Sequence, residues 1–347
     1  MSGGPTRIGV VGVGSLGFHH ARLLSTMAGA KLVGVLDSRA ERQAEVVSSL
    51  GVAPAASLDS LLEAVDALVV AVPTQAHEAV AVPALQRGVH VLIEKPIAPS
   101  LGAADRILAA ARVTGALVQI GHVERFNAAL RACEPYLEQP MFVESHRLAP
   151  FAPRGTDVAV VLDLMIHDLD LVLSLMKSRV ETISAVGVPV LTSSTDIANA
   201  RLEFAGGGVA NLTASRVSLE RMRKIRFFQR SGYISLDLAA GKGEYLRLKP
   251  GISAELLGEL AAGVGSGGVA GASGGGAALA TGVRDLLDLV ERVSFAGDGA
   301  EPLERELASF LAAVQGNAPV PVTGHDGRRA LAVALEIVER IGRHVAH

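Results

Sequence analysis

The sequence predicts an α/β protein in which a doubly wound parallel domain precedes an α+β domain with a largely antiparallel, open-faced sheet. Three observations support this fold class. Short Val/Ile-rich strands alternate with helical segments over the first third of the chain, and a glycine-rich turn follows the first strand. After a helix at 160–176, strands follow one another without intervening helices. A length of 347 residues is enough for two domains with separate cores.

The strands of the first domain, from RIGVVGVG to ALVQIGH, are almost continuously apolar, as in a parallel sheet that helices cover on both faces. We predict this domain over residues 1–121. The α+β domain is predicted over 122–324, with a flexible glycine-rich loop at 251–282. A helix over 325–347 is expected to pack back on the first domain.

Composition and charge narrow the class of protein. The chain is 49% hydrophobic and 19% charged, with a mean hydropathy of +0.38 and a net charge of −3. We therefore expect a soluble globular protein that binds neither nucleic acid nor a membrane. The basic stretch RMRKIRFF at 221–228 is interpreted as a solvated strand face, with a phosphate-contacting patch as the alternative. A single cysteine, Cys133, and an N-terminus without a signal-peptide pattern predict a cytoplasmic protein.

The turn GVGSLG has the glycine spacing of the dinucleotide-binding fingerprint of Rossmann domains. It follows a strand and opens a helix, and Asp37 ends the second strand 20 residues after Gly17. Asp37 is expected to accept hydrogen bonds from the adenosine ribose and to repel a 2′-phosphate, which favours NAD over NADP, although nearby Arg39 weakens this preference. The predicted cofactor contacts in this region are Gly12, Gly14, Ser15, Leu16, Gly17, Asp37, Ser38 and Arg39.

Two later strands end at the same edge of the predicted sheet, where a cofactor binds in this fold. The residues that follow them are further predicted cofactor contacts: Val72, Pro73, Thr74, His77, Glu94 and Lys95. For His77, a role at the start of a helix is an equal alternative. Lys95 lies in the stretch IEKP and is expected over the nicotinamide region.

The stretch VVLDLMIHDLDLVLSLM at 160–176 is apolar but carries three carboxylates and an imidazole. At helical spacing, Asp163, His167, Asp170 and Ser174 form one polar stripe. Structural hydrogen bonds to nearby backbone are one interpretation. Two ionisable groups one turn apart on a buried helix favour the other, a functional site.

GVGSLG, EKP and the DLMIH helix, in this order and at these separations, resemble the glucose-fructose oxidoreductase, inositol dehydrogenase and MocA family (Gfo/Idh/MocA). The similarity extends over nearly the whole chain, including EPLERELASFL near its end. This resemblance implies that Lys95, Asp163 and His167 face the substrate beside the nicotinamide. The polar stripe would then line the cleft between the two domains.

Two segments, GHVERFNAAL and ESHRLAPFAPRGTDVAVVLDLMIHDLD, resemble one branch of the family, the UDP-N-acetylglucosamine 3-dehydrogenases. These enzymes prepare a 3-keto sugar nucleotide for transamination towards the 2,3-diamino sugars of lipid A. The resemblance implies the substrate contacts Glu124, Arg125, Asn127, Arg147, Arg154 and Asp157. For each arginine, a structural salt bridge is an equal alternative. Ala128 departs from the family pattern, which often has proline there.

The implied reaction is hydride transfer from C3 of the sugar to NAD. In this reaction His167 acts as general base, Asp163 orients the imidazole or holds a neighbouring hydroxyl, and Lys95 donates to the reacting oxygen. The division of proton transfer between Lys95 and His167 is left open. A metal held by Asp163, His167 and Asp170 is not expected, because this hydride transfer needs none.

Three alternatives remain: a family enzyme acting on an inositol, a free sugar or a uronate nucleotide; a non-catalytic NAD-binding sensor; and a purely structural scaffold. The scaffold would leave the polar stripe unexplained, and a sensor is expected to lack the lysine or the histidine. Self-association through the open sheet face predicts a homodimer or homotetramer.

Overall fold

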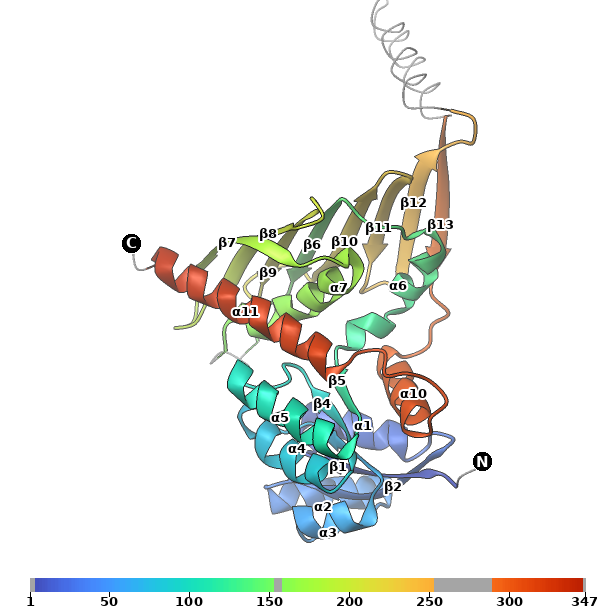
Figure 1. The fold of residues 1–347 in the computed structure, drawn as a ribbon, viewed down its shortest axis with the longest axis vertical. Coiled ribbons are helices and arrows are strands. Elements are labelled where there is room, and N and C mark those ends of the chain that lie inside the picture. The colour runs from blue at the N-terminus through green and yellow to red at the C-terminus, as the bar shows by residue number, and fades with distance from the viewer. Residues whose placement is uncertain (1–3, 153–157, 253–288, 346–347) are drawn as a thin grey trace, which may run out of the picture.

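The computed structural model describes residues 4–152, 158–252 and 289–345. The first part of the chain forms a five-stranded sheet in the order β2-β1-β3-β4-β5, with all neighbouring strands parallel (Figure 1). Its strands are β1 (Thr6–Val11), β2 (Ala30–Leu36), β3 (Ala67–Val70), β4 (His90–Glu94) and β5 (Val118–Gly121). Its helices are α1 (Ser15–Leu24), α2 (Ala40–Leu50), α3 (Leu58–Ala64), the 3₁₀ turn η1 (Thr74–Ala76), α4 (His77–Gln86) and α5 (Leu101–Thr114).

Helices on both faces explain the apolar strands, since every residue of β3 and β5 is buried. The order of the strands reverses between β1 and β3, which extend to opposite sides of the sheet. In doubly wound sheets, ligands bind outside the carboxyl ends of the strands at such a switch point. The predicted Rossmann domain is confirmed, and the turns after β1, β3 and β4 meet at this edge.

The second sheet has eight described strands in the order β13-β12-β11-β10-β6-β9-β8-β7, and each neighbouring pair is antiparallel except β6 with β9. The strands are β6 (Phe142–Leu148), β7 (Val180–Val188), β8 (Ile197–Phe204), β9 (Val209–Ser215), β10 (Met222–Gln229), β11 (Gly232–Asp237), β12 (Lys242–Leu248) and β13 (Val290–Ala296). The predicted largely antiparallel sheet is confirmed.

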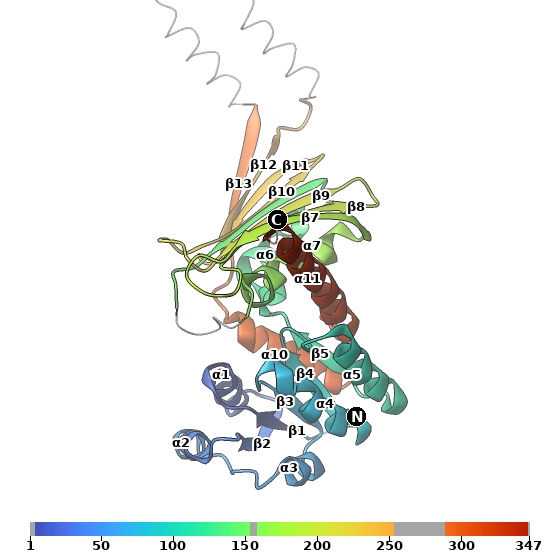
Figure 2. The same cartoon turned by 90° about the vertical axis from the view of Figure 1, so that its left-hand side faces the viewer.

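The described helices that pack against this sheet lie on one of its faces. They are α6 (Ala128–Cys133), α7 (Ile166–Met176) and α11 (Gly324–Val345). Short turns flank the first two: η2 (Val123–Phe126) precedes α6, η3 (Glu134–Tyr136) follows it, and η4 (Val161–Met165) precedes α7. Figure 2 shows these helices between the sheet and the first domain. On the opposite face, side chains such as Val186, Arg201 and Phe228 are exposed.

Helix α10 (Pro302–Val314) departs from the predicted domain division, which assigned residues 122–324 to the second domain. Its side chains Leu307 and Phe310 are fully buried in the same core cluster as Ile8, Val10 and Leu92 of the first sheet. The amphipathic pattern of the helix predicts that it buries one face, but not which sheet receives that face. The chain therefore returns to the first domain after completing the second sheet.

Helix α11 packs against both sheets. Ala334 and Ile337 belong to the core under the eight-stranded sheet, whereas Leu331 belongs to the core of the first domain. The prediction that residues 325–347 pack on the first domain describes one of these two sides.

Of the predicted glycine-rich loop at 251–282, residues 253–282 lie outside the described part of the chain. Among the described helices, none combines the length and the apolar character that crossing a membrane requires.

Candidate active site

The glycine-rich turn after β1 has the shape that a dinucleotide phosphate needs. Gly12 has φ +83°, and a Cβ there would lie 2.7 Å from the backbone of Ala71. A Cβ on Gly17 would lie 1.8 Å from the carbonyl oxygen of Gly12, so only glycine allows α1 to approach the strand this closely. By contrast, a Cβ on Gly14 would meet only Arg39 Nη2, at 3.9 Å. This open space lies at the first turn of α1, where free N–H groups and the helix dipole favour an anion.

Asp37, at the end of β2, closes the turn from the other side. Its carboxylate accepts hydrogen bonds from the backbone N–H of Val13 at 2.8 Å and of Arg39 at 3.0 Å. Burial raises the pKa of Asp37, but these hydrogen bonds outweigh it and hold the pKa below its ordinary value. Arg39 pairs with the same carboxylate at 3.4 Å and keeps a largely exposed side chain. Ser15, Leu16 and Ser38 are exposed beside it, as the predicted cofactor contacts require.

His77 is the first residue of α4, as in the helix-start alternative, and its ring is buried instead of facing the cofactor region. The ring is 1% exposed and lies between two loops. Its Nε2 is 3.0 Å from the carbonyl oxygen of Val72, and its Nδ1 is 3.1 Å from that of Pro96 and 3.2 Å from that of Ile97. His77 therefore ties the loop after β3 to the loop after β4, because its position at the first turn of α4 points the ring inward. Pro73 is exposed and Thr74 is partly exposed, so these two remain available to a ligand.

Glu94 also points away from the predicted cofactor position. Its side chain turns into the first domain, where Oε1 lies 2.6 Å from Nε2 of the buried His20. The alternation of side chains along β4 places Glu94 and Lys95 on opposite sides of the strand end. Glu94 is thus a buried acid behind the lysine.

Lys95 and Asp163 meet across the two domains. The ammonium group of Lys95 donates to the backbone oxygen of Asp163 at 2.6 Å, and it lies 3.5 Å from Oδ1 of the same residue. Burial lowers the pKa of Lys95, and the nearby charges of Asp163 and Glu94 offset only part of this effect. The Asp163 side chain is 39% exposed and so remains open to a ligand.

The stretch that carries Asp163 and His167 is not one regular helix. Residues Val161–Met165 form a π-helical turn, and the α-helix begins at Ile166. A π turn widens the backbone spacing, and such turns are frequent at functional sites. Here it shifts Asp163 relative to the stripe that regular spacing predicts. The apolar pattern of the sequence is equally compatible with both geometries, so the π turn gave no sequence signal.

His167 projects from the first turn of α7 towards the same region. Its Nδ1 is buried, and no group in the described part of the chain hydrogen-bonds to it. Burial, together with the positive charges of Lys95 and Arg147, puts the pKa of His167 well below its ordinary value. The ordinary pKa of about 6.5, on which the prediction of a general base relied, therefore does not apply. The imidazole is neutral throughout the neutral range and can accept a proton.

Three predicted substrate contacts, Glu124, Asn127 and Arg147, form a buried network of hydrogen bonds instead. Arg147 is 3% exposed; its guanidinium donates to both oxygens of Asp168, at 2.9 and 2.8 Å, and to Glu124 at 2.8 Å. Asn127 uses its side chain to bond Glu124 and the backbone oxygen of Leu238, each at 2.9 Å. The salt-bridge alternative thus holds for Arg147, since burying a charge requires a partner.

Arg125 and Asp170 form a second, partly buried ion pair, with Arg125 Nε at 2.5 Å from Asp170 Oδ2. The Arg125 side chain keeps 18% of its surface exposed, whereas Asp170 is 2% exposed. Asp170 is therefore occupied by an arginine rather than exposed with Asp163 and His167. Arg154 and Asp157 lie outside the described residues.

Sequence reasoning missed Arg223. Within the basic stretch 221–228, Lys224 and Arg226 alternate with the buried Ile225 and Phe227, so the solvated face holds for these two. Arg223 points the other way: its Nη1 lies 3.7 Å from Glu124, and its side chain is 44% exposed. Arg223 lies two residues before Ile225, so the alternation of side chains along a strand would have placed it on the same face as this buried residue.

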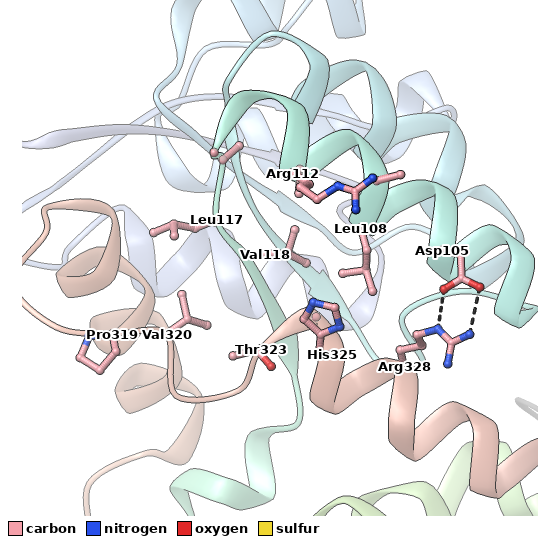
Figure 3. Close-up of a pocket in the computed structure, with 15 residues that line it drawn as sticks. Asp105, Leu108, Arg112, Leu117, Val118, Pro319, Val320, Thr323, His325 and Arg328 are labelled. Atoms are coloured by element: carbon pink, nitrogen blue, oxygen red, sulfur yellow. Dashed lines mark hydrogen bonds and ion pairs between the residues drawn. The ribbon is translucent and has the colours of Figure 1, made fainter.

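A hollow of about 1070 Å³ lies elsewhere, between α5, the edge strand β5 and the start of α11. Figure 3 shows its wall, where Arg328 reaches Asp105 beside an apolar lining that includes Leu108 and Val118. None of the predicted site residues lines it. This hollow is therefore separate from the predicted site.

Comparisons with known proteins agree with this geometry. Residues 6–122 match the family described as "Oxidoreductase family, NAD-binding Rossmann fold", and residues 118–235 match "GFO/IDH/MocA C-terminal domain". The chain is 38% identical over 337 residues to UDP-N-acetylglucosamine 3-dehydrogenase of Acidithiobacillus ferrooxidans, covering 95% of this chain and 96% of that one. It is 27% identical over 231 residues to scyllo-inositol 2-dehydrogenase (NAD(+)) of Bacillus subtilis, covering 61% and 68%.

Solved structures give the same result. The A. ferrooxidans enzyme superposes with a TM-score of 0.81 at 34% identity over 97% of this chain and 98% of that chain. The WlbA dehydrogenase of Bordetella pertussis, in complex with NADH and UDP-GlcNAcA, shares the fold at 18% identity, with a TM-score of 0.75 over 99% and 97% of the two chains. The chain therefore belongs to the Gfo/Idh/MocA family of oxidoreductases, whose first domain binds NAD.

Proposed function

We propose that the protein oxidises the 3-hydroxyl of UDP-N-acetylglucosamine to the 3-keto sugar nucleotide with NAD, as on the route to the 2,3-diamino sugars of lipid A. One observation carries the catalytic part of this proposal: Lys95 and Asp163 meet between the two domains, with the lysine ammonium 2.6 Å from the Asp163 backbone oxygen. The similarity to the A. ferrooxidans enzyme over 95% of the chain supports the choice of substrate.

The residues around the glycine-rich turn fit NAD. The open space at Gly14 admits a diphosphate, and Asp37 presents a carboxylate where the adenosine ribose is held in this fold. When bound, NAD supplies the hydride acceptor for C3 of the sugar. Arg39 already pairs with Asp37, so the site carries both a group that favours NAD and one that can contact a 2′-phosphate.

Two side chains handle the proton and the developing charge on the sugar oxygen. Neutral His167 accepts the proton of the 3-hydroxyl, and the ammonium group of Lys95 donates to the oxygen as it gains negative charge. Asp163 keeps Lys95 in place through its backbone oxygen and offers its exposed carboxylate to a neighbouring hydroxyl. Arg147, paired with Asp168 and Glu124, adds a fixed positive charge behind His167.

The anionic half of the substrate requires cationic groups that keep accessible surface. Arg125 and Arg223 meet this condition, with side chains 18% and 44% exposed. We assign contacts with the diphosphate to these two. Arg154 and Asp157, outside the described residues, stay proposed substrate contacts. Glu124, Asn127 and Arg147 are assigned to the support beneath the substrate, because their polar groups already have partners.

We further propose a homodimer or homotetramer formed through the open face of the eight-stranded sheet. Exposed apolar side chains on that face, including Val186, Val188 and Phe228, support this assignment.

A cytoplasmic location is proposed because NAD and sugar nucleotides are found there. Binding to nucleic acid is not proposed, since Arg226 of the basic stretch pairs with Glu144 across the strands.

The test is NADH formation by the purified protein with NAD and UDP-N-acetylglucosamine, in the presence of a carbonyl trap. Parallel reactions contain myo-inositol, a UDP-uronate or NADP. Turnover with UDP-N-acetylglucosamine and NAD is expected. Turnover with another of these substrates only would assign a different dehydrogenase of the family. NAD binding without any turnover would assign a non-catalytic sensor.

A further inference from the structure

A sealed cluster of three ionisable side chains lies behind Lys95. His20 from α1, Glu94 from the end of β4 and Glu306 from α10 are 0%, 7% and 0% exposed. One ring nitrogen of His20 and one carboxylate oxygen from each acid all lie within 4.8 Å of one another. The elements that carry these residues are far apart in sequence, and they meet because α10 returns to the first domain.

Glu306 is the unusual member of this cluster. Both of its carboxylate oxygens are buried, and neither has a hydrogen-bond partner among the described residues. An ionised carboxylate in this position is strongly disfavoured, because it loses hydration and gains no compensating bond. A second carboxylate, that of Glu94, lies close by. Two buried carboxyl groups this close oppose each other's ionisation, which favours a proton on one of them at neutral pH.

We propose that Glu306 carries a proton at neutral pH, so that the cluster holds a single negative charge, on Glu94, directly behind Lys95. Glu306 is then a positioning residue for the dehydrogenation, acting through Glu94. The pKa of Glu306 agrees with this assignment: burial and the adjacent Glu94 both raise it well above its ordinary value. His20 Nε2 lies 2.6 Å from Glu94 Oε1, and in the proposed state the ring donates to the ionised Glu94.

No charged or hydrogen-bonding group of the described residues around Glu306 bonds its carboxyl oxygens to stabilise an ionised carboxylate, so protonation is the simplest way to neutralise it. From α1 it faces His20, and from β4 it faces Glu94. From β5, Gln119 donates through Nε2 to the backbone oxygen of Glu306 at 3.1 Å and to the Ser309 hydroxyl at 3.2 Å, and it makes no hydrogen bond to the Glu306 carboxyl group. The ionised side chains of η2 are already paired, Glu124 with Arg147 and Arg125 with Asp170. On α10 itself, Arg305 pairs with Asp298.

A metal ion fits this cluster less well. His20 Nε2 and Glu94 Oε1 are 2.6 Å apart, which is a hydrogen-bond distance. Two ligands on a tetrahedral zinc ion lie about 3.3 Å apart, as follows from bonds of about 2.0–2.1 Å. The pair would have to separate before it could hold an ion. The metal remains an outcome of the test.

The proton matters because of its effect on Lys95. The charge of Glu94 raises the pKa of the lysine against the effect of burial. A second negative charge on Glu306 would repel Glu94 from its place beside His20 and would change the field at the lysine. A neutral Glu306 prevents both changes. This kinetic consequence rests on the proposed dehydrogenase function, whereas the protonation state itself does not.

The first experiment measures the proton without turnover. Infrared spectra of the full-length protein, with and without ¹³C-labelled glutamate, are expected to show a protonated glutamic acid carbonyl band at pH 7. The band is lost in Glu306→Gln and kept in Glu304→Gln, a matched change on the exposed side of the same helix. Its absence from the wild type would overturn the proposal, even if the Glu306→Gln protein does not fold.

Stability against pH gives an independent check. Folded protein with protonated Glu306 holds a proton that the unfolded chain releases above a pKa of about 4.3. The folding equilibrium constant of the wild type should therefore fall relative to that of Glu306→Gln as the pH rises from 5 to 8, by up to about tenfold per pH unit. Parallel curves for the two proteins would contradict the proposal.

The positioning role is tested by the pH profile of kcat/KM with NAD and UDP-N-acetylglucosamine. Ionisation of Glu306 contributes an alkaline limb in the wild type, and Glu306→Gln should move this limb by about one pH unit or more, whereas Glu304→Gln should not. An unmoved limb would overturn the positioning role.

Metal analysis of the purified protein is the last experiment. A stoichiometric divalent cation that is lost in Glu306→Gln would assign the cluster to a metal instead.

Discussion

His167 and Lys95 belong to different domains, the charge of Lys95 lowers the pKa of His167, and each side chain has lost most of its contact with water. His167 is neutral and desolvated, and we expect it to accept the proton of the substrate hydroxyl through a ring nitrogen that faces this group. We expect His167→Ala to lower kcat by about 10²- to 10⁴-fold. The dissociation constant for NAD, measured by fluorescence titration, should remain unchanged. His344→Ala, an exposed histidine on α11, is the matched control. Equal kcat values for wild type and His167→Ala would remove this residue from the reaction.

The lowered pKa of His167 has a defined sign in pH experiments. Because the folded state disfavours protonation, the imidazole remains a competent base well below pH 6.5, and the acid limb of kcat/KM should lie below the ordinary histidine value. The lowered pKa of His167 also makes the stability of the folded protein depend on pH. The unfolded state binds a proton first as the pH falls through about 6.5, so His167 destabilises the fold below that pH. His167→Gln should flatten this part of the stability curve, and an acid limb at 6.5 would contradict the assignment.

Cofactor choice depends on Asp37 and its pairing with Arg39. Asp37→Ser removes the negative charge that repels a 2′-phosphate and releases the guanidinium that now pairs with it. We expect the ratio of kcat/KM for NADP to that for NAD to rise about tenfold or more, equivalent to about 1.4 kcal/mol. Initial rates with both cofactors measure this ratio. An unchanged ratio would show that another residue sets the preference.

Among the elements, the junction of β6, η2 and α7 depends on a buried charge network. Arg147 on β6 bonds Asp168 on α7 and Glu124 on η2. Asp168→Ala leaves the arginine with one partner instead of two, and the expected loss is about 3–5 kcal/mol in the free energy of unfolding by urea. The control is Asp59→Ala at the exposed Asp59–Arg87 pair, where the expected loss is below about 1 kcal/mol. Similar losses would mean that the network contributes little.

Sequence patterns predicted some of these elements better than others. The parallel sheet and the glycine turn could be predicted because continuous apolar strands and three spaced glycines each match one geometry. Strands β6, β12 and β13 were not predicted, because charged side chains such as Glu244 and Arg292 alternate along them and pair across the open face.

At the site, sequence and family resemblance brought Lys95, Asp163 and His167 together. They did not reveal that Glu94 turns inward, because the direction of a side chain at a strand end depends on which helix packs there. For His77 the helix-start alternative gave the position, but not the burial of the ring between two loops. Glu306 could not be connected with Glu94 at all, since nothing local to α10 indicates that this helix crosses back to the first sheet.

For the whole molecule, the open sheet face predicts the assembly. Phe142, Phe228 and Tyr233 lie side by side on it, with ring centroids 5.3 and 4.9 Å apart. Phe228→Glu places a charge within this group and should shift light scattering from an oligomer to a monomer. Val113→Glu, at an 84% exposed position on α5, should leave the mass unchanged. A wild-type monomer would refute assembly through this face.

The return of α10 to the first sheet has a consequence for protein synthesis. The amino-terminal half of the chain leaves the ribosome first, but Ile8, Val10 and Leu92 remain without the cover of Leu307 and Phe310 until translation has passed residue 314. Final packing of the cofactor-binding half therefore waits for the entire eight-stranded sheet to be made. A nascent chain that stalls before α10 exposes this apolar surface, so chaperones can bind it and proteases can degrade it.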